Sequence, residues 1–561
     1  MAFSELLQCA GDFGKFQIIQ SILTGLLNIL MITHMLVENF SAATPAHRCY
    51  IHLLDSTKSG TNFTKNLTTE ELLRVSIPMS PDQKPEQCRR FKQIQWQLLD
   101  LNESVANINE LDTEPCLDGW IYDQSVFTST IVTQWDLVCD SQSLKVLSQF
   151  LFMTGSMLGT PISGYFADRF GRKPLLLCFS LVCALTGVCS AFAPTFSIYC
   201  TLRLIVALSL GTIFNNSLVL LVEWCPTQFQ PMITTAITLI LSIGQVLLAG
   251  LAYVFRDWQT LQLSISLPYF VYFLFIWWFS ESARWLIMEG KLENSLRELK
   301  RVANFNGSKD AANNLNLEFL RSAMKTELAS RTDQIKIKEL LASPIMCRTI
   351  LCLFFIRFSA LFFFYGLMLD LKNLGDNLFL NQALLGVIDI PTKYPAFFIM
   401  KYINRRTALA PVLFLAGSSV LINIFIPKDW PNWRLAIAMI GKGFMAIYFN
   451  MGIIYNNELL PTGMRSTLQG LITLVSRLGA TAGTFVLITK YYFAPLPMIF
   501  YGAIPILASI SVYFLPETRN CPLPDSIADV EKRTVRGTGN LAGLVDTILD
   551  GLRENTDNDA L

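Results

Sequence analysis

Charge is scarce in this chain, and so is histidine. Charged residues make up 16% of the sequence, against roughly 25% in an ordinary soluble domain, while hydrophobic residues reach 52%. Only three histidines occur, and none belongs to a His-Glu-x-x-His zinc motif. A Gly-x-x-x-x-Gly-Lys-Ser/Thr phosphate loop is also absent, because Gly441-Lys442-Gly443 has neither the spacing nor the hydroxyl. These absences argue against an enzyme and against an ATP-driven protein, and no cofactor, metal or nucleic-acid partner is expected.

Long apolar runs, in contrast, are abundant. Crossing about 30 Å of hydrocarbon at 1.5 Å per residue takes roughly 20 apolar residues. Lipid admits only helices or closed barrels, and these runs do not alternate as barrel strands do. We therefore predict an all-α polytopic membrane protein with twelve transmembrane helices. The runs cover residues 16–37, 146–166, 175–192, 198–222, 232–254, 259–279, 347–371, 378–400, 407–427, 433–456, 466–489 and 496–515.

A charged phrase occurs twice at the ends of these runs, about 236 residues apart. The first copy comprises Asp168-Arg169-Phe170-Gly171-Arg172, Glu223 and Glu281; the second comprises Asn404-Arg405-Arg406, Glu458 and Glu517. Matching halves of membrane helices are typical of transporters built from repeats. We predict two pseudo-symmetric six-helix halves, 16–279 and 347–515, joined by the loop 280–346. Without an ATP site, such a transporter is a secondary carrier driven by solute or ion gradients.

The loops between the runs set the orientation. Lys and Arg gather around 169–173, 401–406 and 284–348, so these loops and both termini, 1–15 and 516–561, are expected in the cytoplasm of a plasma membrane protein. The loop 38–143 then faces outward. It contains three glycosylation sequons, at Asn62, Asn66 and Asn102, and four cysteines, Cys49, Cys88, Cys116 and Cys139. In an oxidising space four cysteines form two disulfides, in any of three pairings.

Ionisable residues inside the apolar runs are candidate functional residues, because an unpaired charge in the membrane costs several kcal/mol. They are Arg203, Arg357, Asp389, Lys393, Lys442 and Arg477. Five cations against one anion favour an anionic substrate. Several structural alternatives remain open: Asp389 and Lys393 have the i,i+4 spacing of an intrahelical ion pair, Arg203 suits backbone carbonyls or an acidic network, and Lys442 suits helix packing between two glycines.

Arg477 is the leading candidate for a substrate contact. It lies in the middle of its run with no acid within a helical turn, and the repeat aligns it with Ser242 and aligns Gly479 with Gly244. The fold therefore needs no charge there, and a guanidinium fork suits a carboxylate or sulfate. Aromatic residues on the seventh and tenth runs would line the apolar part of a cavity. They are Phe364, Tyr365, Tyr448 and Phe449.

Acids and bases at the cytoplasmic ends of both halves are expected to form salt bridges that latch this side and reform as the halves rock. The alternative is an ordinary solvated loop. The predicted latch residues are Asp168, Arg169, Arg172, Glu223, Glu281, Arg284, Glu458, Arg465, Glu517 and Arg519.

From Met1 to about Asp529 the chain resembles the organic anion transporter branch of the solute carrier organic ion transporter family, within the major facilitator superfamily. The resemblance rests on Asp168 to Lys173, Glu281 to Leu286, Asn457 to Thr462, Leu515 to Arg519 and Cys116 to Trp120. It implies anion contacts at Lys393 and Arg477, a cavity residue at Asn39 and an aromatic contact at Tyr365. Leu239 and Leu241 stand near an expected cavity Tyr, which favours bulky conjugates such as steroid sulfates. The resemblance also implies exchange with an intracellular dicarboxylate.

The sequence thus predicts a plasma membrane carrier of small organic anions that works by alternating access. An organic cation or zwitterion carrier, and a non-transporting receptor on a carrier fold, are the alternatives. Besides lipid, substrate and counter-anion, the polar tail after Asn520 is a possible contact for a scaffold protein.

Overall fold

The fold is seen in a computed structural model of the chain. It describes residues 7, 13–55, 68–80, 84–99, 112–226, 228–308, 316–318, 320–321, 343–369, 377–427, 429–461, 464–519, 524 and 530–531. Within these ranges, nine helices are long and apolar enough to cross a membrane, and two shorter apolar helices and the 29-residue α7 complete twelve crossing elements. Large apolar side chains stay uncovered on the outer surface, for example Phe425 at 85% exposure, as expected where lipid is the solvent.

The first half contains six crossing elements. They are α2 (Lys15–Leu36) continued by α3 (Glu38–Ser41), α7 (Gln142–Phe170), α8 (Arg172–Ala191), α9 (Phe196–Glu223), α10 (Gln230–Val254), and α11 (Trp258–Ser266) with α12 (Pro268–Ile276). The sixth span is divided because Pro268 begins a new helix at its first position. Two short helices follow, α13 (Ala283–Met288) and α14 (Leu292–Phe305).

The second half repeats the arrangement. Its elements are α18 (Pro344–Leu369), α19 (Leu378–Val387) with α20 (Lys393–Tyr402), α21 (Arg405–Phe425), α22 (Pro431–Leu459), α23 (Arg465–Val486) with the 3-10 turn η7 (Leu487–Tyr491), and α24 (Leu496–Val512). The eighth span is interrupted at residues 388–392, where Pro391 cannot continue a helix. This interruption changes which charges meet, as described below.

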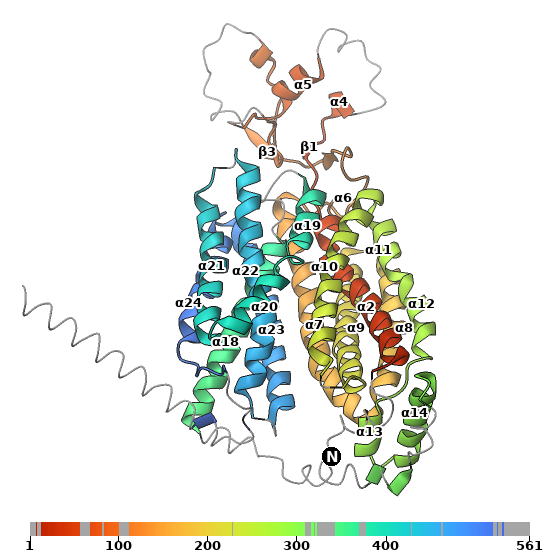
Figure 1. Cartoon of the computed structure of the whole chain (residues 1–561). Coiled ribbons are helices and arrows are strands. Elements are labelled where there is room, and N and C mark those ends of the chain that lie inside the picture. The colour runs from red at the N-terminus through yellow and green to blue at the C-terminus, as the bar shows by residue number, and fades with distance from the viewer. Residues whose placement is uncertain are drawn as a thin grey trace, which may run out of the picture.

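The two halves meet through swapped helix pairs, and they stand side by side in Figure 1. Helix α7 packs against α23, while α19, the counterpart of α7, packs against α10, the counterpart of α23. Phe150 and Phe485, with ring centroids 5.5 Å apart, belong to the first pair. Such reciprocal pairing is the contact pattern of a two-fold axis between repeats.

Close crossings inside the halves depend on small residues. A Cβ on Gly479 of α23 would lie 2.2 Å from the carbonyl oxygen of Phe358 on α18. At the equivalent crossing, a Cβ on Gly244 of α10 would lie 2.4 Å from Ile32 of α2. Glycine lets membrane helices approach each other closely. Gly244 and Gly479 therefore hold corresponding places in the two halves, which puts Arg477 at the level of Ser242.

The segment from residue 44 to residue 141, here called the cap, covers one end of the bundle (Figure 1). Strand β1 (His47–Cys49) pairs antiparallel with β4 (Trp120–Tyr122), and β2 (Arg89–Phe91) pairs antiparallel with β3 (Thr113–Pro115). Its short helical elements are α4 (His52–Asp55), α5 (Thr69–Ser76), η2 (Trp96–Leu99), α6 (Ile131–Gln134) and η4 (Cys139–Ser141). We call this the cap end and the opposite one, where α7 meets α8, the charged end.

Two disulfides hold the cap together. Of the three pairings that the sequence left open, the structure has Cys49–Cys116 and Cys88–Cys139. Cys49 and Cys116 are buried with Ile51 and Ile77 in a small apolar cluster. The three predicted glycosylation sites, Asn62, Asn66 and Asn102, lie outside the described residues.

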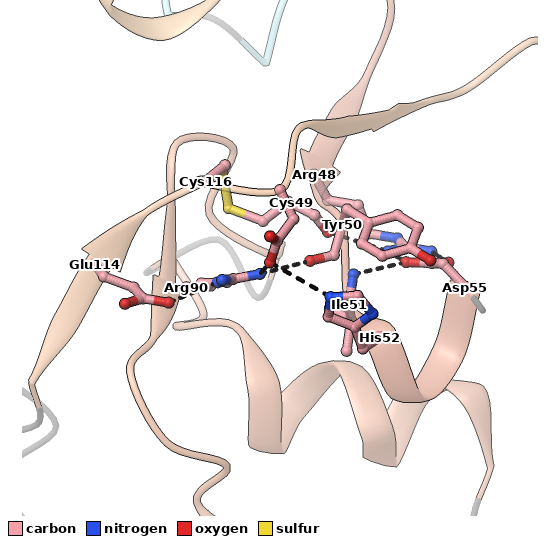
Figure 2. Close-up of polar contacts among 10 residues, drawn as sticks. Arg48, Cys49, Tyr50, Ile51, His52, Asp55, Arg90, Glu114 and Cys116 are labelled. Atoms are coloured by element: carbon pink, nitrogen blue, oxygen red, sulfur yellow. Dashed lines mark hydrogen bonds and ion pairs between the residues drawn. A yellow bond between two sulfur atoms is a disulfide. The ribbon is translucent and has the colours of Figure 1, made fainter. Parts of the chain in front are cut away.

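Arginines tie the strands of the cap to its turns (Figure 2). Arg90 donates to Glu114 at 2.9 Å, to Asp118 at 2.6 Å and to the carbonyl oxygen of Tyr50 at 3.1 Å. Arg48 forms a two-pronged pair with Asp55 at 2.6 and 2.7 Å, and the same carboxylate accepts the backbone N–H of Ile51. Bidentate pairs of this kind fix orientation as well as adding energy.

Candidate functional site

At the charged end of the first half, Arg172 is the centre of a network. Its guanidinium lies 3.3 Å from Glu223 at the end of α9 and 3.5 Å from Asp168. The carboxylate of Glu281 accepts the backbone N–H groups of Arg172 and Lys173, at 3.0 and 3.1 Å. A carboxylate at a helix N-terminus meets unpaired N–H groups and the positive end of the helix dipole. Glu281 therefore caps α8.

The second half repeats this network with Arg405. Its guanidinium lies 3.3 Å from Glu458, and Glu517 accepts the N–H groups of Arg405 and Arg406 at 2.9 and 3.0 Å. The true counterpart of Arg405 is therefore Arg172, 233 residues earlier, because both begin a helix that a glutamate caps. Aligning Asp168 with Asn404, as the offset of about 236 residues suggested, is wrong at this point.

The turns before the two helices differ. Gly171 has a φ of +95°, and a Cβ there would lie 2.5 Å from Glu281, so this position needs glycine. Asn404 has a φ of −62°, which suits any residue. Asn404 instead accepts from Arg519 at 3.4 Å, and Arg519 also donates to the carbonyl of Tyr402 at 2.7 Å.

The remaining predicted latch residues are less central. Arg169 is exposed and bonds Tyr165 at 3.4 Å, Arg465 donates to the carbonyl of Leu460 at 3.2 Å, and Arg284 lies exposed on α13. The ion pairs of Arg172 and Arg405 both join helices of one half. In this conformation the two networks stabilise each half, and a bridge across the halves at this end stays a prediction.

Of the cations predicted inside the membrane, two are neutralised by buried acids. Arg203 lies 3.4 Å from Glu38, donates to the carbonyl of His34 at 3.3 Å and stacks over Phe152 at 4.2 Å. Arg203 is fully buried and Glu38 is 4% exposed. The sequence interpretation placed Glu38 outside the first span, and this pair shows why it belongs inside.

The second neutralised cation is Lys442. It lies 3.1 Å from Asp389, donates to Gln245 at 3.0 Å and bonds the carbonyl of Leu385. The alternative pair between Asp389 and Lys393 does not form, because the helix is interrupted between them and the i,i+4 geometry is lost. Since Gln245 comes from α10, this network connects the two halves.

Arg477 has no carboxylate partner among the described residues, although it is only 8% exposed. It lies within hydrogen-bonding reach of the Tyr365 hydroxyl, and its guanidinium is 5.7 Å from the ring of Phe214 on α9. Tyr365 also contacts the sulfur of Met35 on α2, at 3.2 Å. Arg477 therefore sits in the second half and faces the first half through Phe214.

Arg357 and Lys393 are the other cations without an ion pair in the described part of the chain. With the Asn456 amide oriented to offer its oxygen, Arg357 donates to it at 2.6 and 2.9 Å, and Arg357 stacks over Tyr448 at 6.0 Å. Lys393 is half-buried and lies 3.5 Å from the amide oxygen of Asn450. Arg477, Arg357 and Lys393 thus lie beside neutral side chains and have no ion pair among the described residues.

The four predicted aromatic residues form one continuous cluster. Phe364 contacts Tyr365 at 5.3 Å and Phe449 at 5.8 Å, and Phe449 contacts Tyr448 at 5.8 Å. The ammonium of Lys442 lies 5.9 Å from the ring of Phe364. At one end of the cluster Tyr365 adjoins Arg477, and at the other end Tyr448 adjoins Arg357.

Asn39 also joins the two halves. Its side chain donates to the carbonyl of Met368 on α18 at 2.9 Å and to Gln382 on α19 at 3.1 Å. Together, Asn39 and the cations define a candidate site between the halves. The sequence interpretation did not select Glu38, Gln245 and Arg405 as site residues. Each has its partner on a distant segment, and sequence spacing alone does not reveal such partners.

Comparison with known proteins identifies the class. A family model described as "Sugar (and other) transporter" matches residues 101–525. Solute carrier family 22 member 22 of Mus musculus is 47% identical over 533 residues, covering 95% of this chain and 96% of that protein. The steroid transmembrane transporter SLC22A24 of Microcebus murinus is 45% identical over 531 residues, with 95% and 96% covered, and solute carrier family 22 member 11 of Homo sapiens is 45% identical over 543 residues, with 96% and 98% covered.

A solved structure supports the fold. The inward open conformation of the xylose transporter XylE from E. coli aligns with a TM-score of 0.56 at 14% identity, covering 91% of this chain and 98% of that one. The predicted all-α major facilitator fold is confirmed, as is the expectation of a transporter and not an enzyme. The chain belongs to the sugar (and other) transporter family and, within it, to solute carrier family 22.

The family name inferred from the motifs is corrected by these relatives. The chain was expected in the solute carrier organic ion transporter family, but its relatives are members of solute carrier family 22. The motifs mark the shared superfamily fold, and short charged phrases do not separate one carrier family from another. The protein is a membrane carrier that transports organic ions.

Proposed function

We propose that this carrier moves amphipathic organic anions, such as sulfate or carboxylate conjugates. The observation that carries the proposal is the charge balance between the halves. The two buried acids, Glu38 and Asp389, are each paired with a cation, whereas Arg477 has no carboxylate partner in the described part of the chain. A buried charge without a counter-charge is unfavourable, and a bound anion supplies one.

The contacts of Arg477 suit an oxyanion such as a carboxylate or a sulfate. A guanidinium offers five donors in a fixed fork, and here its neighbours are a phenol and an aromatic ring, which leave donors for a carboxylate or sulfate. In the proposal, Arg477 and Lys393 hold the anionic group. Phe364, Tyr365, Tyr448 and Phe449 contact the apolar body, and Asn39 adds a polar contact at the edge.

Steroid sulfates are the proposed preferred class. A 45% identical relative is named as a steroid transmembrane transporter. On α10, Leu239 and Leu241 are half-buried and apolar. A more apolar wall favours a fused ring system over a small aryl acid.

The proposed transport cycle is alternating access with exchange against an intracellular dicarboxylate. The halves would rock about the α7–α23 and α10–α19 contacts, and the networks of Arg172 and Arg405 would keep each half rigid during this movement. Lys and Arg at the charged end support a cytoplasmic location for that end and both termini, in the plasma membrane. The cap would then be extracellular and glycosylated, and a scaffold contact would fall on the last residues of the tail, which lie outside the described residues.

Uptake by cells that express the chain tests the proposal. Labelled estrone sulfate, para-aminohippurate and tetraethylammonium are compared at matched surface expression. We expect saturable uptake of estrone sulfate that excess unlabelled anions inhibit and tetraethylammonium does not. Preloading the cells with glutarate is expected to raise anion uptake. Entry of tetraethylammonium in preference to both anions would contradict the proposal of an anion carrier. Anion uptake that does not change with glutarate preloading would contradict the exchange step alone.

A further inference from the structure

A cavity lies at the cap end, between the two halves. It has a volume of about 670 Å³, which is in the range of sites for drug-sized ligands. Its lining comes from α3, the cap, α7 and the end of α10 in the first half, and from α18, α19 and η7 in the second. Of the residues proposed above for the central site, Asn39 is the one that also lines this cavity.

One wall of the cavity is aromatic and is built by both halves. Phe379, on α19, contacts Phe127 of the cap at 5.4 Å and Tyr253 of α10 at 5.8 Å. Phe40 stacks behind Phe379 at 5.5 Å. Tyr253 is 60% exposed, so much of its ring remains free for further contact. Such a wall suits the flat apolar face of a ring system.

The inner end of the cavity carries polar groups that lack partners. Gln149 on α7 is 5% exposed, and neither its amide nitrogen nor its amide oxygen has a hydrogen-bond partner among the described residues. The Oε2 atom of Glu38, which also lines the cavity, is buried and unbonded as well. Buried polar groups are nearly always hydrogen-bonded, so each unpaired one needs an explanation. A ligand hydroxyl or carbonyl at this position would satisfy the Gln149 amide.

Two cations lie nearer the mouth of the cavity. Lys145 is four residues before Gln149 on the same face of α7, and its ammonium donates to the hydroxyl of Thr44 at 3.2 Å. Arg256 donates to the carbonyl of Ser125 at 3.3 Å and stacks over Tyr253 at 5.4 Å. A guanidinium has five donors, so the bonds of Arg256 leave donors for an anion, and Lys145 adds a second positive charge to the lining. Asp123 also lines the mouth, where its carboxylate accepts the backbone N–H of Ser125 at 2.9 Å.

We propose that this cavity is a second, outer binding site for the same class of substrate, and the proposal rests on the proposed function above. The occupant is a ring-bearing organic anion with a hydroxyl or carbonyl at the end opposite its charge. Its rings lie along Phe379, Phe127 and Tyr253, its oxygen meets Gln149, and its anionic group meets Arg256. The site holds the substrate at the cap end before the substrate reaches Arg477.

Binding of labelled estrone sulfate to the purified full-length carrier tests the outer site. The Arg477→Ala variant is used to weaken the central site, so that the remaining binding reports on the cap end. We expect two classes of site in the wild type and one in Arg477→Ala. In that background, Gln149→Leu is expected to lower the affinity about tenfold, because the ligand oxygen then loses its hydrogen bond to the Gln149 amide. Gln142→Leu, which changes an exposed glutamine on the same helix, is the matched control.

Ligand analogues make the test independent of folding. Estrone sulfate without its 17-keto oxygen should bind the outer site about tenfold more weakly than estrone sulfate, and Gln149→Leu should abolish this preference. Arg256→Gln, at the mouth, should weaken binding of the sulfate but not of neutral estrone. A single class of site in the wild type, lost in Arg477→Ala, would overturn the outer site and leave the proposed function intact. Unchanged keto preference in Gln149→Leu would also overturn it, whereas uptake of cations alone would overturn the proposed function itself.

Discussion

Lys442 of α22 and Asp389, in the interruption between α19 and α20, form an ion pair of 3.1 Å in the interior of the protein. Lys442 is 1% exposed and Asp389 is 7% exposed. Gln245 of the other half contacts both, at 3.0 Å from the lysine and 3.5 Å from the aspartate. Asp389 is the only anion among the six ionisable residues predicted inside the apolar runs. Because it is paired with Lys442, it does not balance the positive charge of Arg477 or Lys393.

The Lys442–Asp389 pair predicts a strong coupling between the two positions. Removing one partner of a buried pair leaves an unpaired charge and costs about 3 to 5 kcal/mol, whereas replacing both can be nearly neutral. We expect Asp389→Asn and Lys442→Met each to lower the melting temperature of the purified carrier, and the double variant to recover most of the loss. The control uses Lys393→Met in place of Lys442→Met. Combining Lys393→Met with Asp389→Asn should not recover the melting temperature lost in Asp389→Asn. Recovery with Lys393→Met instead would contradict the observed pairing.

The matching caps of α8 and α21 predict matching effects in the two halves. Glu281 and Glu517 each accept two backbone N–H groups of the helix that they cap, and charge-assisted bonds to a helix N-terminus contribute roughly 1 to 2 kcal/mol. We expect Glu281→Gln and Glu517→Gln to lower the melting temperature by similar amounts. Glu293→Gln, at an exposed first-turn position of α14, should lower the melting temperature by much less. A loss confined to one half would mean that the two networks are not equivalent.

The sequence predicted the architecture well because its signals are long and local. Length and hydropathy are enough to place twelve spans, and the repeat of Glu223, Glu281, Glu458 and Glu517 survives intact in the structure. The exception is the start of α21, where matching loops by offset aligned Asp168 with Asn404. A loop can lose residues without disturbing the helices on either side, so the helix N-terminus, with its capping glutamate, is the reliable marker.

The partners of the buried charges were harder to predict. Asp389 and Lys393 have ideal helical spacing, but a proline between them ends the helix, so proximity in sequence does not become contact. Glu38 and Arg203, in contrast, are 165 residues apart and meet only because α3 packs beside α9. The unpartnered amide of Gln149 gives no sequence signal at all, since its lack of a hydrogen bond depends on every neighbour around it.

The two disulfides predict the behaviour of cysteine variants of the cap. The bridges Cys49–Cys116 and Cys88–Cys139 span 67 and 51 residues, and loops of this size are worth about 4 kcal/mol each in the chain-entropy account. We expect Cys49→Ser and Cys116→Ser to reduce the amount of folded carrier at the surface to the same extent, and the double variant to be no worse than either. Peptide mapping without reduction should recover these two pairs. A linked Cys49–Cys88 peptide would contradict the pairing.

Asp55 predicts a pH-dependent contribution to the stability of the cap. Burial acts to raise the pKa of Asp55, but hydrogen bonds from Arg48 and from the Ile51 N–H, with the Arg48 charge, outweigh it and hold the pKa below the ordinary value of 3.8. A lowered folded-state pKa means that the stabilisation is complete above pH 3.8 and is lost as the pH falls through the lowered pKa. The melting temperature of Asp55→Asn should therefore lie below that of the wild type at pH 7, with the gap closing as the pH falls below 3.8.

The exposed Asp140, also in the cap, provides the control for this pH series. Asp140→Asn should track the wild type at every pH. A gap for Asp55→Asn that stays constant down to the lowest pH would mean that its effect comes from shape and not from charge.

The role of Arg477 in anion binding is measured by uptake of labelled estrone sulfate at matched surface expression. Loss of a charged hydrogen-bonding contact costs about 2 kcal/mol or more, so we predict that Arg477→Ala lowers uptake efficiency by about 30-fold or more, with partial recovery in Arg477→Lys. Arg74→Ala, at an exposed position of the cap, is the matched control and should transport normally. Normal anion uptake by Arg477→Ala would contradict the account and make Arg477 a structural residue.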